Sequence, residues 1–329
     1  MRVLHSFRCS IWITTLVVTT LLLAPQAARA QWHATVGAQS WDSARQALAF
    51  LPNELWIHAG DDVTWTFQAG EIHTVTFLAT SPAAQVRPPF QVGCPGFSGE
   101  PAMFDGTACI STPPLVKGAS FKVAFPAVGN FKLVCLVHPD MTGVVHVLDK
   151  AKPLPHDQIF YDAEAAAQAQ ALLSDRDGEE DDVVSTPGKV IAGLGEISTK
   201  AAGSQTLSVL RFIGDDMIIH AGQTIEWDNE DPETPHTITF GTEPPGDPFP
   251  PSGTVTVDGD GARHAVINSP SDSVHSGFIL AAPQERVGLA QSPLFFTRFR
   301  VTFTRPGTYP YICALHDDLG MKGEIIVLP

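Results

Sequence analysis

The sequence predicts an all-β protein built from two antiparallel β-sandwich domains. Gly and Pro number 27 each in 329 residues, and long helical patterns are scarce, which favours short strands joined by many turns. Short segments alternate between polar and apolar residues with a period of two, as half-buried strands do. The pattern of the first half also recurs in the second, and the length suits about two domains.

We divide the chain into an export signal (residues 1–30), a first domain (31–149), a helical and acidic linker (150–186) and a second domain (187–329). In the signal, Arg2 and Arg8 precede an apolar stretch at 11–24 that is short for a membrane span, and Ala28-Arg29-Ala30 is typical of a cleavage site. An uncleaved membrane anchor is the alternative.

The two domains repeat their strands in one order. The paired segments are 55–60 and 217–222, which end in His-Ala-Gly, then 63–67 and 224–227, 73–77 and 236–240, 121–125 and 299–303, 130–134 and 308–312, and 143–148 and 323–328. Between the domains, residues 157–174 are rich in Ala and Gln and predict one helix, and an acidic run follows at 179–182. The helix either packs on a domain or acts as a spacer. The insertion at 241–293 is rich in Pro and Gly and predicts a loop, with a counterpart at 80–114.

Each domain carries two histidines, one cysteine and one methionine in the same order. The two sets are His73, Cys135, His138 and Met141, and His236, Cys313, His316 and Met321. Two imidazoles and a thiolate with a weak thioether are the ligand set of a mononuclear blue-copper site. Three ligands come from one tight loop, and the other histidine comes from a separate strand. The sequence therefore predicts one copper ion in each domain.

Two further cysteines lie outside these sets once Cys9 has left with the signal. Cys94 and Cys109 enclose a loop rich in Pro and Gly, and an even pair in an oxidising compartment predicts a disulfide. Two free thiols or a second metal site remain the alternatives. Among the other histidines, His58 and His220 are expected to stabilise turns, and His264 and His275 are not expected to bind a metal.

The two ligand patterns resemble those of cupredoxins of the plastocyanin, pseudoazurin and amicyanin type. The C-x2-H-x2-M spacing that ends at Met141 is similar to amicyanin, and the C-x2-H-x4-M spacing that ends at Met321 is similar to plastocyanin and pseudoazurin. The resemblance covers both sandwich segments but neither the helix nor the insertions. It implies Greek-key sandwiches, one type 1 copper per domain and single-electron transfer.

The resemblance also implies that His138 and His316 lie at the solvent edge, where electrons would leave. Val137 and Pro139 would then line an apolar docking rim in the first domain. Asp317 and Asp318 would make the rim of the second domain acidic.

The neighbours of the two cysteines argue against an enzyme. Two-domain nitrite reductases and multicopper oxidases place a histidine beside the type 1 cysteine, whereas Cys135 lies between Val134 and Leu136. Cys313 likewise has no histidine neighbour, and His-x-His pairs are absent from the sequence. We therefore expect an electron carrier. The alternatives are a copper storage, delivery or tolerance protein, and an oxidase or reductase with an unrecognised catalytic copper.

The charge balance limits the partners. The chain has 20 basic and 35 acidic residues, and loss of three arginines with the signal would change the net charge from −15 to −18. Such a chain does not attract nucleic acid through its field. We expect redox protein partners, for example a basic cytochrome or a copper enzyme. We also expect no stable membrane span after signal cleavage, and a bacterial periplasmic or secreted location.

Overall fold

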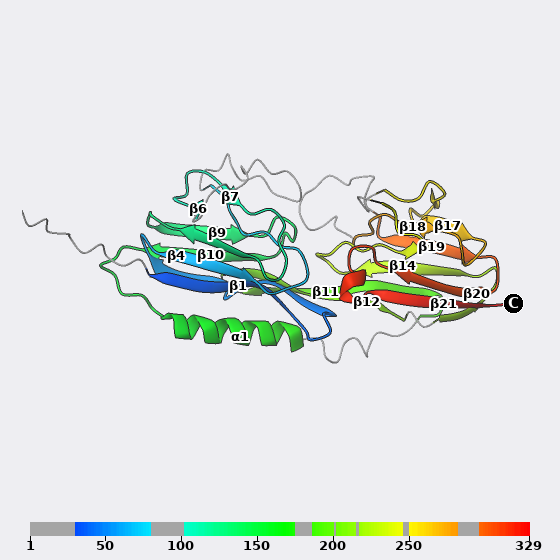
Figure 1. Cartoon of the computed structure of the whole chain (residues 1–329), viewed down its shortest axis with the longest axis horizontal. Coiled ribbons are helices and arrows are strands. Elements are labelled where there is room, and N and C mark those ends of the chain that lie inside the picture. The colour runs from blue at the N-terminus through cyan, green and yellow to red at the C-terminus, as the bar shows by residue number, and fades with distance from the viewer. Residues whose placement is uncertain are drawn as a thin grey trace, which may run out of the picture.

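The protein is mostly β in a computed structural model, which describes residues 30–79, 102–174, 186–200, 202–214, 217–245, 250–281 and 296–329. Residues 30–149 (the first half) and 187–329 (the second half) lie end to end along the longest axis of the molecule, as Figure 1 shows. The predicted signal lies almost entirely outside the described residues. Within them, no helix has the length and apolar character needed to cross a membrane.

Short strands make up most of the first half. They are β1 (Gln31–Gln39), β2 (Arg45–Leu51), β3 (Glu54–His58), β4 (Asp62–Phe67), β5 (Thr76–Phe77), β6 (Ala102–Met103), β7 (Ile110–Ser111), β8 (Ser120–Ala124), β9 (Gly129–Val134) and β10 (Thr142–Leu148).

One helix separates the halves, and the second half repeats the pattern of strands. The elements are α1 (Gln158–Ser174), β11 (Lys189–Lys200), β12 (Gly203–Ile213), β13 (Met217–His220), β14 (Thr224–Glu230), β15 (Thr239–Phe240), β16 (Thr256–Val257), β17 (Arg263–Ile267), β18 (Val274–His275), β19 (Arg298–Phe303), β20 (Gly307–Ile312), the 3₁₀ helix η2 (Asp317–Leu319) and β21 (Lys322–Leu328).

Each half is a sandwich whose two layers enclose an apolar core. One layer is a five-stranded sheet, in the order β3-β10-β9-β5-β7 in the first half and β13-β21-β20-β15-β18 in the second. The other layer is one end of a single 11-stranded sheet, in the order β16-β17-β19-β14-β11-β12-β2-β1-β4-β8-β6. Equivalent strands occupy equivalent positions, which explains why the sequence pattern repeats.

The 11-stranded sheet runs without interruption from one half into the other. Strand β2 pairs antiparallel with β12, so that Ala47 lies opposite Leu207 and Gln46 lies opposite Ser208. All four of these side chains are buried. The sequence predicts a helical linker between the halves but gives no indication of this shared ladder, because strand pairing across domains leaves no local pattern.

Helix α1 packs on the first half instead of acting as a spacer. Leu172 is buried against Ala49 and Leu51 of β2. The hydroxyl of Tyr161 accepts a hydrogen bond from the backbone N–H of Trp56 at 2.9 Å. The helix therefore covers the outer face of the 11-stranded sheet near β1 and β2 (Figure 1).

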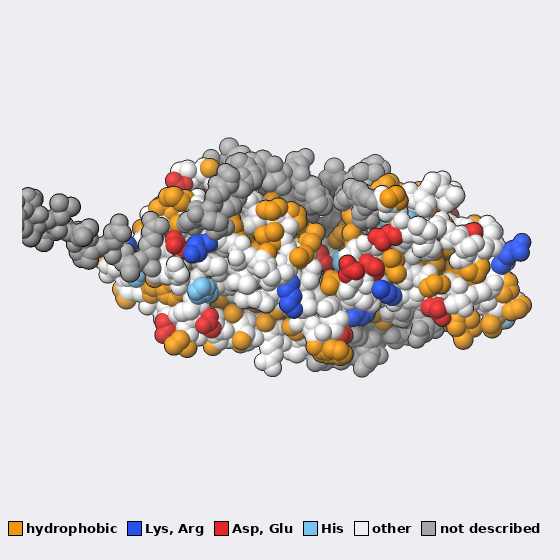
Figure 2. Space-filling model, viewed as in Figure 1, with side chains coloured by type: hydrophobic (Ala, Val, Ile, Leu, Met, Phe, Trp, Pro, Cys, Tyr) orange, Lys and Arg blue, Asp and Glu red, His pale blue; other side chains and the backbone are white. Residues whose placement is uncertain are grey.

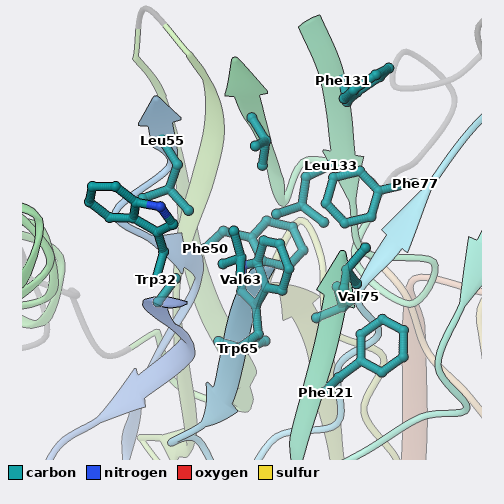
Figure 3. Packing of buried hydrophobic residues seen from close by; sticks show 14 of the residues in the cluster. Trp32, Phe50, Leu55, Val63, Trp65, Val75, Phe77, Phe121, Phe131 and Leu133 are labelled. Atoms are coloured by element: carbon teal, nitrogen blue, oxygen red, sulfur yellow. The ribbon is translucent and has the colours of Figure 1, made fainter. Parts of the chain in front are cut away.

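Aromatic side chains fill both cores. In the first half, the ring of Trp65 meets Phe77 and Phe125 edge-on at centroid distances of 5.5 and 6.3 Å, and Figure 3 shows Trp65 and Phe77 among the other core residues. In the second half, Trp227 occupies the corresponding position beside Phe240. The cysteine and methionine of each predicted metal site belong to the same clusters, so the sites are anchored directly to the cores.

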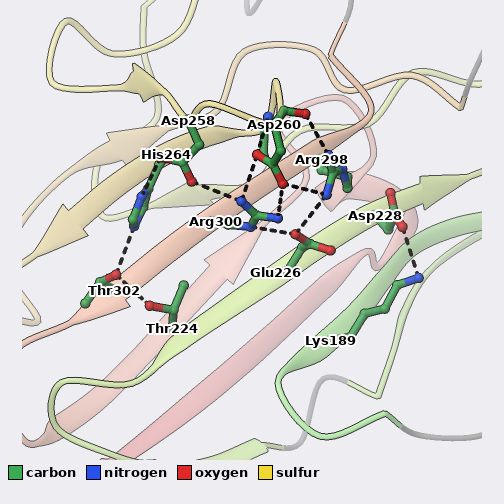
Figure 4. Close-up of polar contacts among 11 residues, drawn as sticks. Lys189, Thr224, Glu226, Asp228, Asp258, Asp260, His264, Arg298, Arg300 and Thr302 are labelled. Carbon is green, nitrogen blue, oxygen red and sulfur yellow. Dashed lines mark hydrogen bonds and ion pairs between the residues drawn. The ribbon is translucent and has the colours of Figure 1, made fainter.

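The described parts of the insertion at 241–293, residues 241–245 and 250–281, contain strands where the composition predicts a loop. Residues 263–267 form strand β17, which alternates between buried and exposed positions and pairs in parallel with β19. The guanidinium of Arg300 holds this segment, because it donates to Asp258 at 3.1 Å and to Asp260 at 2.7 Å (Figure 4). The prediction failed here because these side chains fix the insertion through long-range ion pairs.

The acidic excess of the chain does not form one continuous patch on the face shown in Figure 2. Acidic and basic side chains are interspersed over both halves there, with hydrophobic side chains between them.

Candidate metal centres

Each half brings the ligand atoms of two histidines and one cysteine together in its interior. Site 1 contains His73, Cys135 and His138, with their ligand atoms within 4.8 Å of one another. The Nδ1 atoms of its two histidines lie 3.2 Å apart, and Cys135 Sγ lies 3.7 Å from His138 Nδ1. At metal–ligand bond lengths of ~2.0 Å to nitrogen and ~2.3 Å to sulfur, all three atoms can reach one ion.

Site 2 has the same geometry in the second half. His236, Cys313 and His316 form its cluster. The two Nδ1 atoms lie 3.2 Å apart, and Cys313 Sγ lies 3.8 Å from His236 Nδ1 and 3.3 Å from His316 Nδ1. All six side chains of the two clusters are buried. The sequence-predicted histidines and cysteines are therefore brought together as two equivalent clusters.

The two predicted methionines are fully buried at the ends of their loops. The backbone N–H of Cys135 donates to the carbonyl of Met141 at 3.0 Å, and Cys313 donates to Met321 at 3.1 Å. These bonds close each cysteine–histidine–methionine loop. The thioether role of both methionines remains a prediction.

The residue after the first histidine orients each cysteine. In site 1, the backbone N–H of Thr74 points at Cys135 Sγ at 3.4 Å, and the Thr74 hydroxyl accepts from the N–H of Leu136 at 2.7 Å. In site 2, Thr237 makes the same two contacts, with Cys313 Sγ at 3.3 Å and the N–H of Ala314 at 2.7 Å. The His-Thr pair of each strand therefore positions both a nitrogen and a sulfur ligand.

The surroundings of both cysteines favour the thiolate. Burial alone would raise the pKa of the Cys135 thiol, but His138 and His73 outweigh it and hold that pKa well below its ordinary value. The pKa of Cys313 is lowered in the same way, against its burial, by the two histidines of site 2. The thiolate is the form of cysteine that binds a metal, so the donor set fits a soft, positively charged ion.

Two glycines make room for the first histidine of each site. Gly37 and Gly193 lie at β-bulges in β1 and β11 and have φ angles of +67° and +83°. A Cβ on Gly37 would lie 2.9 Å from His73 Nε2, and one on Gly193 would lie 2.0 Å from His236 Nε2. No residue with a side chain fits at Gly193 unless the ring of His236 moves.

A carboxylate that the sequence analysis missed lies between the two sites. Glu71 Oε2 is 3.0 Å from His316 Nε2, and Glu71 Oε1 is 3.6 Å from His138 Nε2. Burial lowers the pKa of both histidines in the metal-free chain, but their cysteines and Glu71 outweigh it and raise each pKa to about 10. A second missed carboxylate, Asp231, lies 3.8 Å from His236 Nε2.

The predicted solvent-edge role of His138 and His316 is wrong for this structure. Their exposed fractions are 0% and 3%, because the loops that carry them meet at the junction of the two halves. The N–H of Asp140 in one loop donates to the Glu233 carboxylate of the other half at 3.3 Å. The docking rims that the resemblance implies for residues 137–139 and 317–318 stay a prediction.

The sequence also predicts a disulfide, and it predicts no metal at the two histidines of the insertion. Cys94 lies outside the described residues, so the disulfide with Cys109 stays a prediction. His264 bonds to Asp258 at 3.1 Å, and His275 bonds to Thr239 at 2.8 Å, so both have partners other than a metal.

The fold and the two clusters together describe the class of this protein: paired β-sandwiches, each with a buried His-Cys-His cluster that could hold a metal ion. Residues 198–328 match the family model described as copper binding proteins of the plastocyanin/azurin family. This match supports a cupredoxin domain in the second half. No curated protein matches the chain.

Solved structures of amicyanin are among those similar to this chain. A reduced Cu(I) form of an amicyanin mutant at pH 4 is 20% identical, with a TM-score of 0.25, and the match covers 37% of this chain and 87% of that one. The oxidised state of another amicyanin mutant is 20% identical, with a TM-score of 0.25, and covers 36% and 82% respectively. Nothing about function follows from a likeness at this level.

Proposed function

We propose that the protein is an exported electron carrier that binds two type 1 copper ions, one at site 1 and one at site 2. The observation that carries this proposal is the pair of buried clusters, each of which directs two imidazole Nδ1 atoms and one cysteine sulfur at a common point. His73, Cys135 and His138 would hold the first ion, and His236, Cys313 and His316 the second. Met141 and Met321 would supply weak axial ligands.

The donor set suits one-electron chemistry. Copper bound in this way supplies a Cu(I)/Cu(II) couple, in which thiolate and thioether favour Cu(I) and imidazole suits both states. Both loops are closed by backbone hydrogen bonds and packed on apolar cores. Such a rigid frame keeps the ligands in one geometry in both oxidation states, so little needs to rearrange during transfer.

A carrier accounts for the surroundings of the sites better than an enzyme or a store. Catalysis requires a substrate to reach the metal, but the ligand side chains are buried in both halves. A store or delivery protein needs ready release, which buried ligands anchored in apolar cores do not favour. The acidic balance of the chain fits a basic redox protein as partner. We place the protein in a bacterial periplasm or outside the cell.

The first test is copper stoichiometry together with the visible spectrum of the oxidised protein, for the wild type, Cys135→Ser and Cys313→Ser. Two coppers per chain are expected, with an intense thiolate-to-copper band that falls by about half in each variant, because each loses one of two thiolate ligands. Each single variant controls for the other. A colourless wild type, or a third copper that survives both substitutions, would contradict the proposal and favour storage or catalysis.

A further inference from the structure

We propose that Glu71 is a positioning residue shared by both metal sites, so that one carboxylate sets the reduction potentials of both ions together. This inference rests on the proposed function. It concerns a residue outside both ligand sets, and it makes the junction between the halves part of each site.

In each of two ligand histidines, one ring nitrogen faces the His-Cys-His cluster and the other faces away from it. In His138 and His316, the Nδ1 atoms point into the sites, so in a neutral, metal-binding ring the proton must be on Nε2. Both Nε2 atoms face Glu71. The contact with His316 is 3.0 Å, within hydrogen-bond distance, and the contact with His138 is 3.6 Å, within ion-pair distance. One carboxylate group therefore separates the two rings.

Glu71 is held firmly at this position. Its exposed fraction is 5%, and its backbone N–H donates to the side-chain oxygen of Gln46 at 3.3 Å. Gln46 is fully buried and lies on β2, at the pairing with β12 that joins the halves. The preceding Gly70 packs against Leu319, since a Cβ on Gly70 would lie 2.6 Å from Leu319 Cδ2. The segment therefore belongs to the first half but docks on the loop of site 2.

The second half has no equivalent carboxylate at this position. Glu71 lies two residues before His73, and the residue two before His236 is Thr234. The hydroxyl of Thr234 is 3.0 Å from that of Ser208, so it belongs to a different contact. Asp231 approaches His236 alone, at 3.8 Å. Among the residues that the structure describes, Glu71 is thus the carboxylate that contacts a histidine of each site.

The charge of Glu71 has a defined effect on the ligands. A carboxylate that accepts the second N–H of a metal-bound histidine makes that histidine a stronger ligand. A nearby negative charge also stabilises the more positive, oxidised ion, and the effect is large in a buried site because screening is weak. Glu71 should therefore lower the potential of both sites, more strongly at site 2, where the contact is shorter.

The test is a spectroelectrochemical titration of the thiolate-to-copper band in the two-site protein and in Glu71→Gln. Glutamine keeps the shape of glutamate but removes its charge. We expect the whole titration curve to move to higher potential. At site 2 the ratio of oxidised to reduced protein at a fixed potential should fall at least tenfold, which is 59 mV for a one-electron couple. A smaller shift in the same direction is expected at site 1.

Two variants at the same junction serve as matched controls. Asp231→Asn removes a carboxylate beside His236 and should move only the half of the band that belongs to site 2. Glu233→Gln removes a buried carboxylate that accepts the backbone N–H of Asp140, and it should move the curve much less than Glu71→Gln. An equal shift in Glu233→Gln would overturn the proposal, because it would reveal a general effect of charge.

A second measurement does not depend on electron transfer. In the reduced, diamagnetic protein, the Nε2–H protons of His138 and His316 should give downfield proton NMR signals, and both signals should move in Glu71→Gln. If the wild type shows the two-site copper spectrum but neither the potentials nor these signals change, the role of Glu71 is wrong and the proposed function stands. If the wild type lacks that spectrum, the proposed function itself fails.

Discussion

At the scale of single residues, site 2 depends on the absence of a side chain at Gly193 as well as on its ligands. Gly193 lies in the left-handed region of φ at a bulge in β11, and the Cβ of any other residue would lie 2.0 Å from His236 Nε2. Glycine therefore serves two purposes there: it tolerates the backbone conformation, and it leaves room for the ring of a ligand.

Gly193→Ala should displace His236 and damage site 2 while leaving site 1 intact. We expect about half of the thiolate-to-copper band to be lost or shifted, together with a loss of stability that includes ~1–2 kcal/mol for the left-handed backbone. The visible spectrum and the copper content of the purified variant measure this.

Gly222→Ala is the matched control. Gly222 has a φ of +93°, but a Cβ there would meet no atom within 4 Å. The variant should lose a similar amount of stability from the backbone and keep the full spectrum. If both variants retain two normal copper sites, the contact with His236 has no role in the site.

The sequence predicted which histidines and cysteines converge, but it missed the residues around them. His73 and His236 could be found because each opens the same five-residue string, and Cys135 and Cys313 because each lies at a short, repeated spacing from a histidine. Glu71 belongs to no repeat, and its role depends on the second half docking against it. The one available signal was an acidic residue two positions before a buried ligand.

At the scale of elements, helix α1 packs on the sheet through few of its side chains. Tyr161 and Leu172 are its buried residues, whereas Ile159 is 77% exposed. Leu172 lies against alanine and leucine side chains of β2. The attachment of the helix to the sheet is therefore concentrated at a few contacts.

Leu172→Ala should destabilise the protein by about 2–5 kcal/mol, the usual effect of truncating a buried leucine. Ile159→Ala, on the same helix, should change stability by less than about 0.5 kcal/mol because the side chain is already exposed. Denaturation by urea with circular dichroism measures both. Equal effects of the two substitutions would show that the helix does not depend on packing at Leu172.

The sequence located the repeated strand segments around the two sites and the central helix, since these follow from alternating patterns and composition. Strands β1, β2, β11 and β12 were not among the predicted segments. The sequence also did not predict the β17 strand at 263–267, which lies in an insertion rich in Gly and Pro and pairs with β19 far along the chain. Nor did it show that β2 and β12 join the halves. Both failures concern contacts between distant segments, which local periodicity does not record.

At the scale of the whole molecule, several contacts join the two halves to each other. The β2–β12 ladder, the ion pair of Glu71 with His316 and the bond from Asp140 to Glu233 all cross the junction. Unfolding of one half would expose the junction of the other half to water, and the apolar burial there, such as that of Ala47 opposite Leu207, would be lost. We therefore expect the halves to unfold together.

Copper bound at one site should stabilise both halves. In Cys313→Ser, which keeps only site 1, free copper at 1,000 times its Kd should add about 4 kcal/mol to the stability of the folded chain. Differential scanning calorimetry should show one transition, and copper should move all of it to higher temperature. Two transitions, of which copper moves only one, would contradict this coupling.

The ladder between β2 and β12 has a consequence for either half on its own. Separated from its partner, each half would present the bare N–H and C=O groups of a long edge strand, and such edges recruit other chains into sheets. The buried Gln46 and Ser208, which face each other across the ladder, would then meet water or a second copy. A gene fragment encoding one half would therefore tend to yield self-associating protein, and the intact chain avoids this by serving as its own partner.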